Sequence, residues 1–402
     1  MDLQLSDFER AAERIKPILH HTELDLSSTF SSITGGQIYL KCENRQKTGS
    51  FKIRGASNKI ASLIESGQKG PVVASSAGNH AQGVAYAAHR FGIPATIVMP
   101  KAAPIAKAQA TRGYGANVVL SGDCYDDAYA EALRICEAEG ATFLHPYNDP
   151  EVIAGQGTLG LEILSDLSSV DAIVVPAGGG GLLAGVSAAV KLINPRVKIY
   201  GVQAEGADAV ARSFREKKLV TTDSAATIAD GIAVKAPGDL AVDIINRHAD
   251  GVVTVSETEI ANAILLLIER CKQIVEPAGA TPLAAVLSGK LDVKGKRVVC
   301  VMSGGNIDVS FIQTIIERGL VARNRRIRFI AKLLDRPGSL VQLLGIIADA
   351  GANILTVEHD KLDPTLNPNE IGVHIACEVG GKEHGDALIT ALSEHGYSVE
   401  LE

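Results

Sequence analysis

The sequence has 402 residues, a length that exceeds one compact core of ordinary size, so two or three domains are expected. Hydrophobic residues make up 46% and charged residues 21%, which is typical of a folded globular protein. With 39 Lys and Arg against 46 Asp and Glu, a net charge of -7, no dominant basic block and no Trp, the composition argues against nucleic acid as a partner.

The N-terminal segment "MDLQLSDFERAAERIKP" predicts an amphipathic helix and lacks the apolar run of a signal peptide. No stretch of roughly 18 apolar residues follows it, so no membrane-spanning segment is expected. The six cysteines are scattered and form no CxxC pair, which favours reduced thiols. These features predict a cytoplasmic protein without a membrane partner.

The stretch "TGSFKIRG", residues 48–55, places Lys52 among small and polar residues at the start of a predicted helix. A lysine on a helix normally keeps its ammonium group in water. A lysine that instead lies close to a phosphate-binding loop, without an acid beside it in the sequence, has the setting for a Schiff base with an aldehyde cofactor. Lys52 is therefore a candidate for covalent chemistry.

Short β-branched runs alternate with alanine-rich helical patterns up to about residue 310. The predicted strand and helix pairs are "PVVASS" and "HAQGVAYAAHRFG", "ATIVMP" and "IAKAQATRGYG", "NVVLSG" and "YDDAYAEALRICEAEG", "AIVVPAGGGG" and "LLAGVSAAVKLI", and "RVVCVMSGGN" and "VSFIQTIIERG". This alternation predicts an α/β fold with parallel sheets covered by helices on both faces. Ligand chemistry is expected in the loops at the carboxyl ends of the strands.

Three such loops carry candidate binding residues. "PAGGGGLLAG" follows an apolar strand and opens a helix, so its backbone N–H groups suit a phosphate. Gly179, Gly181 and Ala184 also fit the pattern GxGxxA of dinucleotide-binding loops, and Glu205 follows the next strand. A dinucleotide is therefore an alternative ligand for this loop. "ASSAGNHAQG", residues 74–83, suits a carboxylate, although helix capping is an alternative. In "VMSGGN", residues 301–306, Ser303 is either a neutral hydrogen-bond partner or a helix cap.

The pattern changes near "LVARNRRIR", residues 320–328. A compact tail follows, with the order strand "IRFIAKLLD", helix "GSLVQLLGIIADAG", strand "NILTVEHD", strand "EIGVHIACEV", helix "HGDALITALSEHG" and strand "YSVELE". This βαββαβ order is the ferredoxin-like signature. We predict a first domain over 1–322, with a small subdomain over about 48–152 inserted in it, a boundary near residue 325, and a second domain over 326–402.

In this order and spacing, "SFKIRGA", "SSAGNHAQG", "PAGGGGLLAG" and "MSGGN" resemble the pyridoxal-phosphate enzymes of fold type II, the tryptophan-synthase β-like family. Within it they are most similar to the threonine dehydratases, also called threonine ammonia-lyases. The resemblance covers roughly residues 5 to 320 and implies pyridoxal 5'-phosphate as cofactor and an amino acid as substrate. The implied reaction converts L-threonine to 2-oxobutanoate and ammonia, and L-serine to pyruvate.

The resemblance assigns roles to residues of this sequence. Lys52 would hold the cofactor through a Schiff base and then remove the Cα proton of the substrate. Ser303 would face the pyridine nitrogen, and because a neutral Ser leaves that nitrogen largely unprotonated, β-elimination is favoured over transamination. The cofactor phosphate would be held by Gly178, Gly179, Gly180, Gly181 and Leu182, its ring oxygen by Asn79, and the substrate carboxylate by Ser75, Ser76, Gly78 and Asn79.

Other readings stay open. Serine racemases of this family place a serine before the Gly-Asn pair as a second proton donor, and Ala77 stands here instead. They also bind a divalent cation through an acid where this sequence has Gln203, with Glu205 two residues on, so a metal site is undecided. Hydroxyaspartate elimination, β-replacement with a sulfur nucleophile, a nicotinamide-dependent oxidoreductase and a non-catalytic amino-acid sensor complete the alternatives. No histidine is expected to be catalytic, although His80 could touch a ligand.

The tail, with "LLDRPGSLVQLL" and "GANI", resembles an ACT domain, a regulatory module that commonly binds amino acids. The turn of Asp335 and Gly338 would receive the carboxylate of an effector, with Asn353 nearby across a subunit interface; a well-capped turn is the plain alternative. Isoleucine or valine would suit a biosynthetic role. The resemblance also implies a homodimer or homotetramer.

Overall fold

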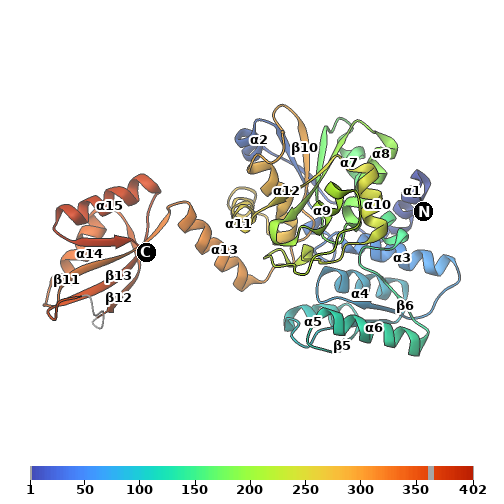
Figure 1. Ribbon diagram of the computed structural model, residues 1–402, viewed down its shortest axis with the longest axis horizontal. Helices are drawn as coiled ribbons and strands as arrows, with labels where there is room; N and C mark the ends of the chain where they lie inside the picture. The colour runs from blue at the N-terminus through green and yellow to red at the C-terminus, as the bar shows by residue number, and fades with distance from the viewer. Residues whose placement is uncertain (1, 361–365, 402) are drawn as a thin grey trace. The chain divides into compact units, whose positions relative to one another are not determined.

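The computed structural model describes residues 2–360 and 366–401 (Figure 1). The chain forms two compact units, Met1–Ile307 and Asp308–Glu402. The second unit begins with helix α13 (Val309–Ala322), whereas the predicted boundary near residue 325 follows that helix. The predicted domain and subdomain limits stay predictions, and each unit is described below by itself.

The larger sheet of the first unit has six strands in the order β1-β2-β10-β7-β8-β9. These are β1 (Leu24–Ser27), β2 (Gln37–Lys41), β10 (Arg297–Val301), β7 (Ala172–Pro176), β8 (Lys198–Ala204) and β9 (Gly251–Val255). All neighbours pair in parallel except β1, which lies antiparallel to β2 at the edge. The expectation of parallel sheets is therefore correct for five of the six strands, and an antiparallel edge strand is a common addition to such sheets.

The central strands of this sheet are buried on both faces. Ile173, Val175 and Val299 point to a core that includes Leu183 of helix α8 (Gly181–Ile193) and Phe8 of helix α1 (Leu5–Ile15). The neighbouring strand residues Val174 and Val298 are also buried and point to the opposite face, where helix α12 (Pro277–Leu287) packs on the same strands. Burial on both faces explains why these strands read as unbroken apolar runs in the sequence.

The helices of the first unit are α1 (Leu5–Ile15), α2 (Ser28–Thr34), α3 (Lys52–Glu65), α4 (Asn79–Phe91), α5 (Ile105–Gly113), α6 (Tyr125–Glu139), α7 (Pro150–Asp166), α8 (Gly181–Ile193), α9 (Ala209–Glu216), α10 (Asp239–His248), α11 (Glu257–Leu266) and α12 (Pro277–Leu287). Short helical turns occur at η1 (Glu43–Arg45), η2 (Glu205–Ala207) and η3 (Asp230–Ile232), and α11 runs into a π-helical turn, η4 (Leu267–Cys271).

The smaller sheet of the first unit is wholly parallel, in the order β5-β4-β3-β6. Its strands are β5 (Asn117–Leu120), β4 (Ala95–Met99), β3 (Val72–Ser75) and β6 (Thr142–Phe143). One face packs on α4 through Ile97 and Val84, and the other packs on α6 through Val98 and Ala128. The two predicted α/β sheets with helices on both faces are thus confirmed.

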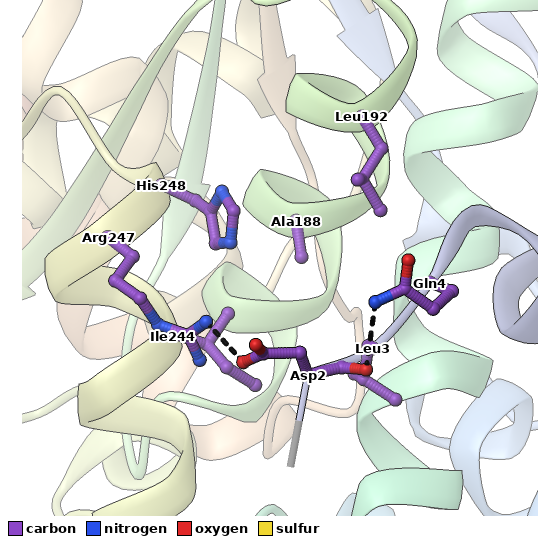
Figure 2. A pocket seen from close by; sticks show the side chains of 8 residues that line it. All are labelled: Asp2, Leu3, Gln4, Ala188, Leu192, Ile244, Arg247 and His248. Atoms are coloured by element: carbon purple, nitrogen blue, oxygen red, sulfur yellow. Dashed lines mark hydrogen bonds and ion pairs between the residues drawn. The ribbon is translucent and has the colours of Figure 1, made fainter.

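The N-terminal segment closes one side of a surface pocket of about 190 Å³ (Figure 2). Its lining residues are Asp2, Leu3, Gln4, Ala188, Leu192, Ile244, Arg247 and His248, from the segment before α1 and from α8 and α10. Arg247 Nη1 donates to Asp2 Oδ1 at 2.6 Å across it. None of the sequence-predicted site residues lines this pocket.

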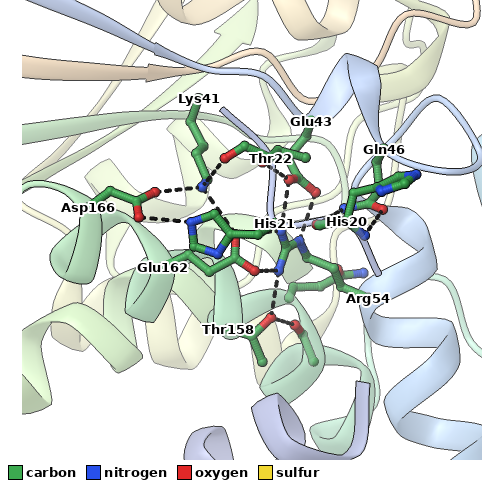
Figure 3. A network of polar contacts seen from close by, with 12 residues as sticks. His20, His21, Thr22, Lys41, Glu43, Gln46, Arg54, Thr158, Glu162 and Asp166 are labelled. Atoms are coloured by element: carbon green, nitrogen blue, oxygen red, sulfur yellow. Dashed lines mark hydrogen bonds and ion pairs between the residues drawn. The ribbon is translucent and has the colours of Figure 1, made fainter. Parts of the chain in front are cut away.

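A network of buried charges holds the start of α3 in place (Figure 3). Arg54 is completely buried, and its guanidinium donates to both carboxylate oxygens of Glu43, at 2.7 and 2.8 Å, and to both of Glu162, at 2.7 and 2.9 Å. A fifth bond reaches Thr158 Oγ1 at 3.2 Å. Lys41 Nζ adds contacts to Glu162 at 3.1 Å and Asp166 at 3.0 Å. The network links α3, η1, β2 and α7.

The second unit contains one four-stranded antiparallel sheet in the order β12-β13-β11-β14. After α13 its elements are β11 (Arg326–Leu334), α14 (Ser339–Asp349), β12 (Asn353–Asp360), β13 (Glu370–Glu378), α15 (Lys382–Glu394) and β14 (Ser398–Leu401). Phe329, Leu343, Val373 and Leu388 are buried in its core. The predicted βαββαβ order is confirmed; the last residue of the predicted strand "YSVELE" lies outside the described residues.

Within residues 2–360 and 366–401, no helix is both long and apolar enough to cross a membrane. All six cysteines fall in this part of the chain and are free.

Candidate active site

Lys52 is the first residue of α3, and its half-buried side chain turns back toward the loop that precedes α7. Its Nζ donates to the carbonyl of Pro146 at 3.0 Å. Removal from water lowers the pKa of Lys52 to about 8, and the Glu276 carboxylate acts in the opposite direction. A lysine with this pKa carries a substantial neutral fraction near pH 8, and the neutral amine is the nucleophilic form.

Two of the predicted loops meet at the start of α3. The backbone N–H of Phe51 donates to the carbonyl of Ser303 at 3.0 Å, and Ser50 forms an isolated antiparallel bridge with Gly304. On the other side, a Cβ on Gly83 of α4 would lie 3.1 Å from the backbone of Lys52. The absence of that Cβ lets α4 approach Lys52 closely, so the "SFKIRGA", "SSAGNHAQG" and "MSGGN" segments converge on one point.

The glycine loop lies between β7 and α8, as predicted. A Cβ on Gly179 would lie 2.4 Å from ring carbons of Tyr147, and Gly180 has a φ of +98°, which residues with a side chain rarely adopt. The backbone N–H groups of Gly178, Gly179 and Gly180 donate to no carbonyl among the described residues. The loop therefore presents a row of free donors at the N-terminus of α8, an arrangement that suits a phosphate.

The residues 145–148 connect Lys52 to this loop. Pro146 accepts the hydrogen bond from Lys52, and the ring of the next residue, Tyr147, packs against Gly179. Tyr147 is held by its hydroxyl, which donates to the carbonyl of Ala236 at 2.9 Å. The glycine loop and Lys52 are thus neighbours of one short segment, which places the free backbone donors and the amine in one site.

The loop between β3 and α4 contains Ser75, Ser76, Gly78 and Asn79. Ser75 is completely buried at the end of β3, and its Oγ has no hydrogen-bond partner among the described residues. Ser76 Oγ accepts from the Gly78 N–H at 3.2 Å. A Cβ on Gly78 would meet nothing within 4 Å, so the loop borders open space. A buried hydroxyl beside open space is available to a ligand.

Asn79, the first residue of α4, belongs to a polar chain that crosses the site. Its Nδ2 donates to the Glu276 carboxylate, at 2.8 Å from Oε1 and 3.0 Å from Oε2. Its Oδ1 accepts from Asn306 Nδ2 at 2.7 Å, and Asn306 Nδ2 also donates to the carbonyl of Thr48 at 2.9 Å. Removal from water raises the pKa of Glu276 to about 7, with Asn79 as the main opposing influence.

Two histidines adjoin Lys52 and are held neutral. Burial lowers the pKa of His80 to about 3, and the Lys52 cation lowers it further. His80 Nε2 is 2.9 Å from the carbonyl of Leu144, and its Nδ1 has no partner among the described residues. Burial, with Lys52 again contributing, lowers the pKa of His145 to about 4. Because His80 and His145 are neutral near pH 7, neither adds a positive charge beside Lys52.

The structure therefore brings Lys52, Asn79, Ser303 and the three loops together. Ser303 is buried, and Leu182 is buried in the first turn of α8. Asp335, Gly338 and Asn353 lie in the second unit: Gly338, with a φ of +93°, precedes α14, and Asn353 begins β12 opposite Glu378. Gln203 is completely buried, and its Oε1 accepts from the Ala211 N–H at 2.8 Å.

No group of three or more His, Cys, Asp or Glu side chains in the described part of the chain is arranged to hold a metal ion.

Sequence reasoning missed Glu276, Asn306 and the segment of Pro146 and Tyr147. Their partners are far away in the chain: Glu276 and Asn79 are 197 positions apart. One signal was available, because Glu276 is the single charged residue of the stretch from 273 to 289. An isolated acid in an otherwise uncharged, helix-forming stretch is expected to be either exposed or functional.

Comparison with known proteins identifies the family. The profile described as "Pyridoxal-phosphate dependent enzyme" matches residues 15–304. The chain is 51% identical over 399 residues to a protein of Thermotoga maritima named L-threonine ammonia-lyase, covering 99% of both chains. Among solved structures, threonine deaminase isoform 2 of Solanum lycopersicum is similar with a TM-score of 0.75 and 36% identity, covering 78% of this chain and 87% of that one. Maize serine racemase is similar with the same TM-score and identity, covering 80% and 99%.

Proposed function

The chain belongs to the pyridoxal-phosphate-dependent enzymes, and we propose that it converts L-threonine to 2-oxobutanoate and ammonia, and L-serine to pyruvate. The observation that carries this proposal is the convergence of a partly neutral lysine, a row of free backbone donors and an unpartnered serine hydroxyl in one site. The near full-length likeness to a protein named L-threonine ammonia-lyase supports the choice of threonine as substrate.

The residues of the site fit pyridoxal phosphate. The free N–H groups of the glycine loop match a phosphate, and the amine of Lys52 matches an aldehyde. Ser75 Oγ and His80 Nδ1 are buried polar atoms without partners among the described residues, which a bound polar ligand would satisfy. When bound, the cofactor supplies an electron-withdrawing ring that acidifies the Cα proton of an amino acid.

The residues of the chain would carry out proton removal and substrate binding. Lys52 Nζ is the base that removes the Cα proton, and its lowered pKa keeps a neutral fraction available near neutral pH. Ser75, Ser76 and Gly78 hold the substrate carboxylate against the N-terminus of α4. The electrons of the Cα–H bond form the Cα–Cβ double bond as the Cβ–O bond breaks. The departing hydroxide takes up one proton, which balances the proton removed from Cα, and leaves as water. The enamine that is released hydrolyses to the 2-oxo acid and ammonia.

Serine racemisation is the second candidate, because maize serine racemase has a similar structure. A racemase needs a proton donor on the face of the substrate opposite the lysine. Ala77, in the loop between β3 and α4, has no dissociable proton. Elimination needs only the one base, Lys52, so the loop composition favours the lyase.

A product assay tests the proposal. The protein with its cofactor is mixed with L-threonine or L-serine, and 2-oxo acids and D-serine are measured. We expect 2-oxobutanoate from threonine and none from the Lys52→Ala variant, while Lys59→Ala, a change about two helix turns further along α3, keeps the activity. D-serine without any 2-oxo acid would overturn the lyase and favour the racemase.

The second unit is proposed to be an ACT regulatory domain. Its βαββαβ order supports this, as does the turn at Gly338, whose positive φ places α14 after a tight loop. The effector, an amino acid such as isoleucine or valine, would place its carboxylate at the turn of Asp335 and Gly338, with Asn353 from a neighbouring subunit. The domain limits 1–322 and 326–402 belong to this proposal, as does a role in isoleucine biosynthesis.

Kinetics on the full-length chain test the regulatory role. We expect isoleucine or valine to change the threonine activity of the wild-type protein, and Gly338→Val, which strains the turn, to remove that response while the basal activity stays. An unchanged response in the variant would exclude this turn as the effector site. A homodimer or homotetramer in the cytoplasm completes the proposal, and light scattering on the purified protein measures the assembly.

A further inference from the structure

Glu276 is a buried acid whose role the proposed reaction has not used. It is 4% exposed and lies directly before Pro277, the first residue of α12. Its backbone N–H donates to the carbonyl of Gly304 at 2.9 Å, so its position is tied to the "MSGGN" loop. A buried carboxylate is costly unless hydrogen bonds or charges compensate it, and such a residue needs a structural or functional reason.

The carboxylate lies in a niche that depends on Gly304. A Cβ on Gly304 would lie 2.3 Å from Glu276 Oε1 and 3.2 Å from Asn79 Nδ2. Only a glycine at that position lets the carboxylate and the amide meet beside Ser303. The "MSGGN" loop therefore serves two purposes: it presents Ser303, and it leaves room for Glu276.

The contacts of Glu276 determine which way the Asn79 amide points. Both carboxylate oxygens accept from Nδ2, and Asn306 Nδ2 donates to Asn79 Oδ1 from the other side. A reversed amide would place its carbonyl oxygen against the carboxylate and its N–H groups against another N–H donor, so that both contacts would become repulsive. Because the amide nitrogen carries two hydrogens, Asn79 can hold the carboxylate and still donate to a second acceptor.

We infer that Glu276 is a positioning residue for the cofactor: it fixes the Asn79 amide with its nitrogen toward the cofactor ring, where Asn79 donates to the ring oxygen. This inference rests on the proposed function, which places pyridoxal phosphate beside Lys52. Lys52 is close enough for the two side chains to influence each other electrostatically, so the carboxylate also favours a cation at the lysine nitrogen. Burial and the Asp230 carboxylate favour the protonated form of Glu276, while Asn79, Lys107 and Lys52 favour the carboxylate.

A thermodynamic cycle on cofactor affinity tests the inference. Pyridoxal phosphate is titrated into the cofactor-free wild-type protein, Glu276→Gln, Asn79→Ala and the double variant, and the dissociation constant is read from the visible band of the bound cofactor. Because a lost hydrogen bond to a charged group is involved, we expect about tenfold weaker binding for Glu276→Gln. If Glu276 acts through Asn79, the double variant binds no more weakly than Asn79→Ala.

A control for nearby charge and a second variant of Glu276 accompany this test. Asp230→Asn removes an exposed acid that also influences Glu276 but does not contact Asn79, and it should bind the cofactor within twofold of wild type. Glu276→Asp withdraws the carboxylate by one methylene and should weaken binding in the same direction, which serves as a second variant if Glu276→Gln fails to fold.

The results distinguish failure of the positioning role from failure of the proposed reaction. Wild-type cofactor affinity in Glu276→Gln, or losses that simply add in the double variant, would overturn the positioning role. Because affinity is measured without substrate, this result is independent of whether 2-oxobutanoate is formed. A protein that binds the cofactor through this cycle but gives no 2-oxo acid would refute the proposed reaction and leave the role of Glu276 intact.

Discussion

Replacement of Arg54 by methionine should destabilise the first unit severely. The side chain is completely buried, as is Glu43, and its five hydrogen bonds go to Glu43, Glu162 and Thr158. Methionine fills a similar volume, but among the described residues it leaves the Glu43 carboxylate with the Thr22 hydroxyl, at 2.6 Å, as its remaining side-chain donor. Removal of one partner of a buried ion pair typically costs about 3–5 kcal/mol, because the other charge stays buried without compensation.

The loss should also reach the active site. Arg54 is two residues after Lys52 in the first turn of α3, so its bonds to η1 and α7 fix the helix that carries the lysine (Figure 3). Arg54→Lys keeps the charge but cannot form paired bonds to two carboxylates, so we expect a smaller loss of stability together with reduced activity.

Urea unfolding measures the effect, with circular dichroism and the visible band of the bound cofactor as probes, since the cofactor reports on the first unit. Lys59→Met is the matched control on the same helix. It breaks the Lys59–Asp149 pair of 2.6 Å, but Asp149 keeps its two backbone N–H donors at the start of α7, so the loss should be smaller than for Arg54→Met. A loss of less than about 1 kcal/mol for Arg54→Met would show that the buried network does not hold α3, and would refute this reasoning.

Three further predictions follow from the site. The rate at which the cofactor-free protein captures pyridoxal phosphate should rise with pH to a half-maximum near pH 8, because the neutral Lys52 amine reacts; an increase that continues to the ordinary lysine value of 10.5 would contradict the lowered pKa. Gly181→Ala should weaken cofactor binding at least about tenfold, because its Cβ would lie 2.8 Å from the Tyr147 carbonyl oxygen; Gly113→Ala, where a Cβ meets nothing within 4 Å, should bind normally. Since the pKa of Glu276 is raised from 4.5 to about 7, the stability contributed by its protonated form is complete below pH 4.5 and is lost as the pH rises through 7. In the cofactor-free protein, Glu276→Gln should therefore gain stability relative to wild type over that interval, and parallel pH profiles of the two would contradict the burial argument.

The features that the sequence predicted correctly are local ones. Strands such as Ala172–Pro176 are continuous apolar runs. The glycine loop directly follows strand β7, and the loop that leads to Asn79 directly follows strand β3. The βαββαβ order of the tail could be read because each element has its own periodicity. In such cases the local pattern and the fold agree, so one sequence is sufficient.

The features that the sequence did not reveal depend on distant contacts. The antiparallel strand β1 has only four residues, one of them charged, and is recognisable mainly through its pairing with β2. The partners of Arg54 lie 11 and 108 positions away, and no local pattern links them. Glu276 was missed for the same reason, because it is 197 positions from Asn79 in the sequence and meets it only in the folded first unit. Ser303 was found only because its loop has a recognisable motif.

The most direct test of the account is to identify the lysine that binds the cofactor. The protein loaded with pyridoxal phosphate is treated with sodium borohydride, which reduces the carbon–nitrogen double bond of a lysine-bound aldehyde to a stable amine, and the modified peptide is located by mass spectrometry. The account predicts one modified residue, Lys52, and no modification in Lys52→Ala. Modification of a different lysine, or retention of the label in the variant, would contradict it.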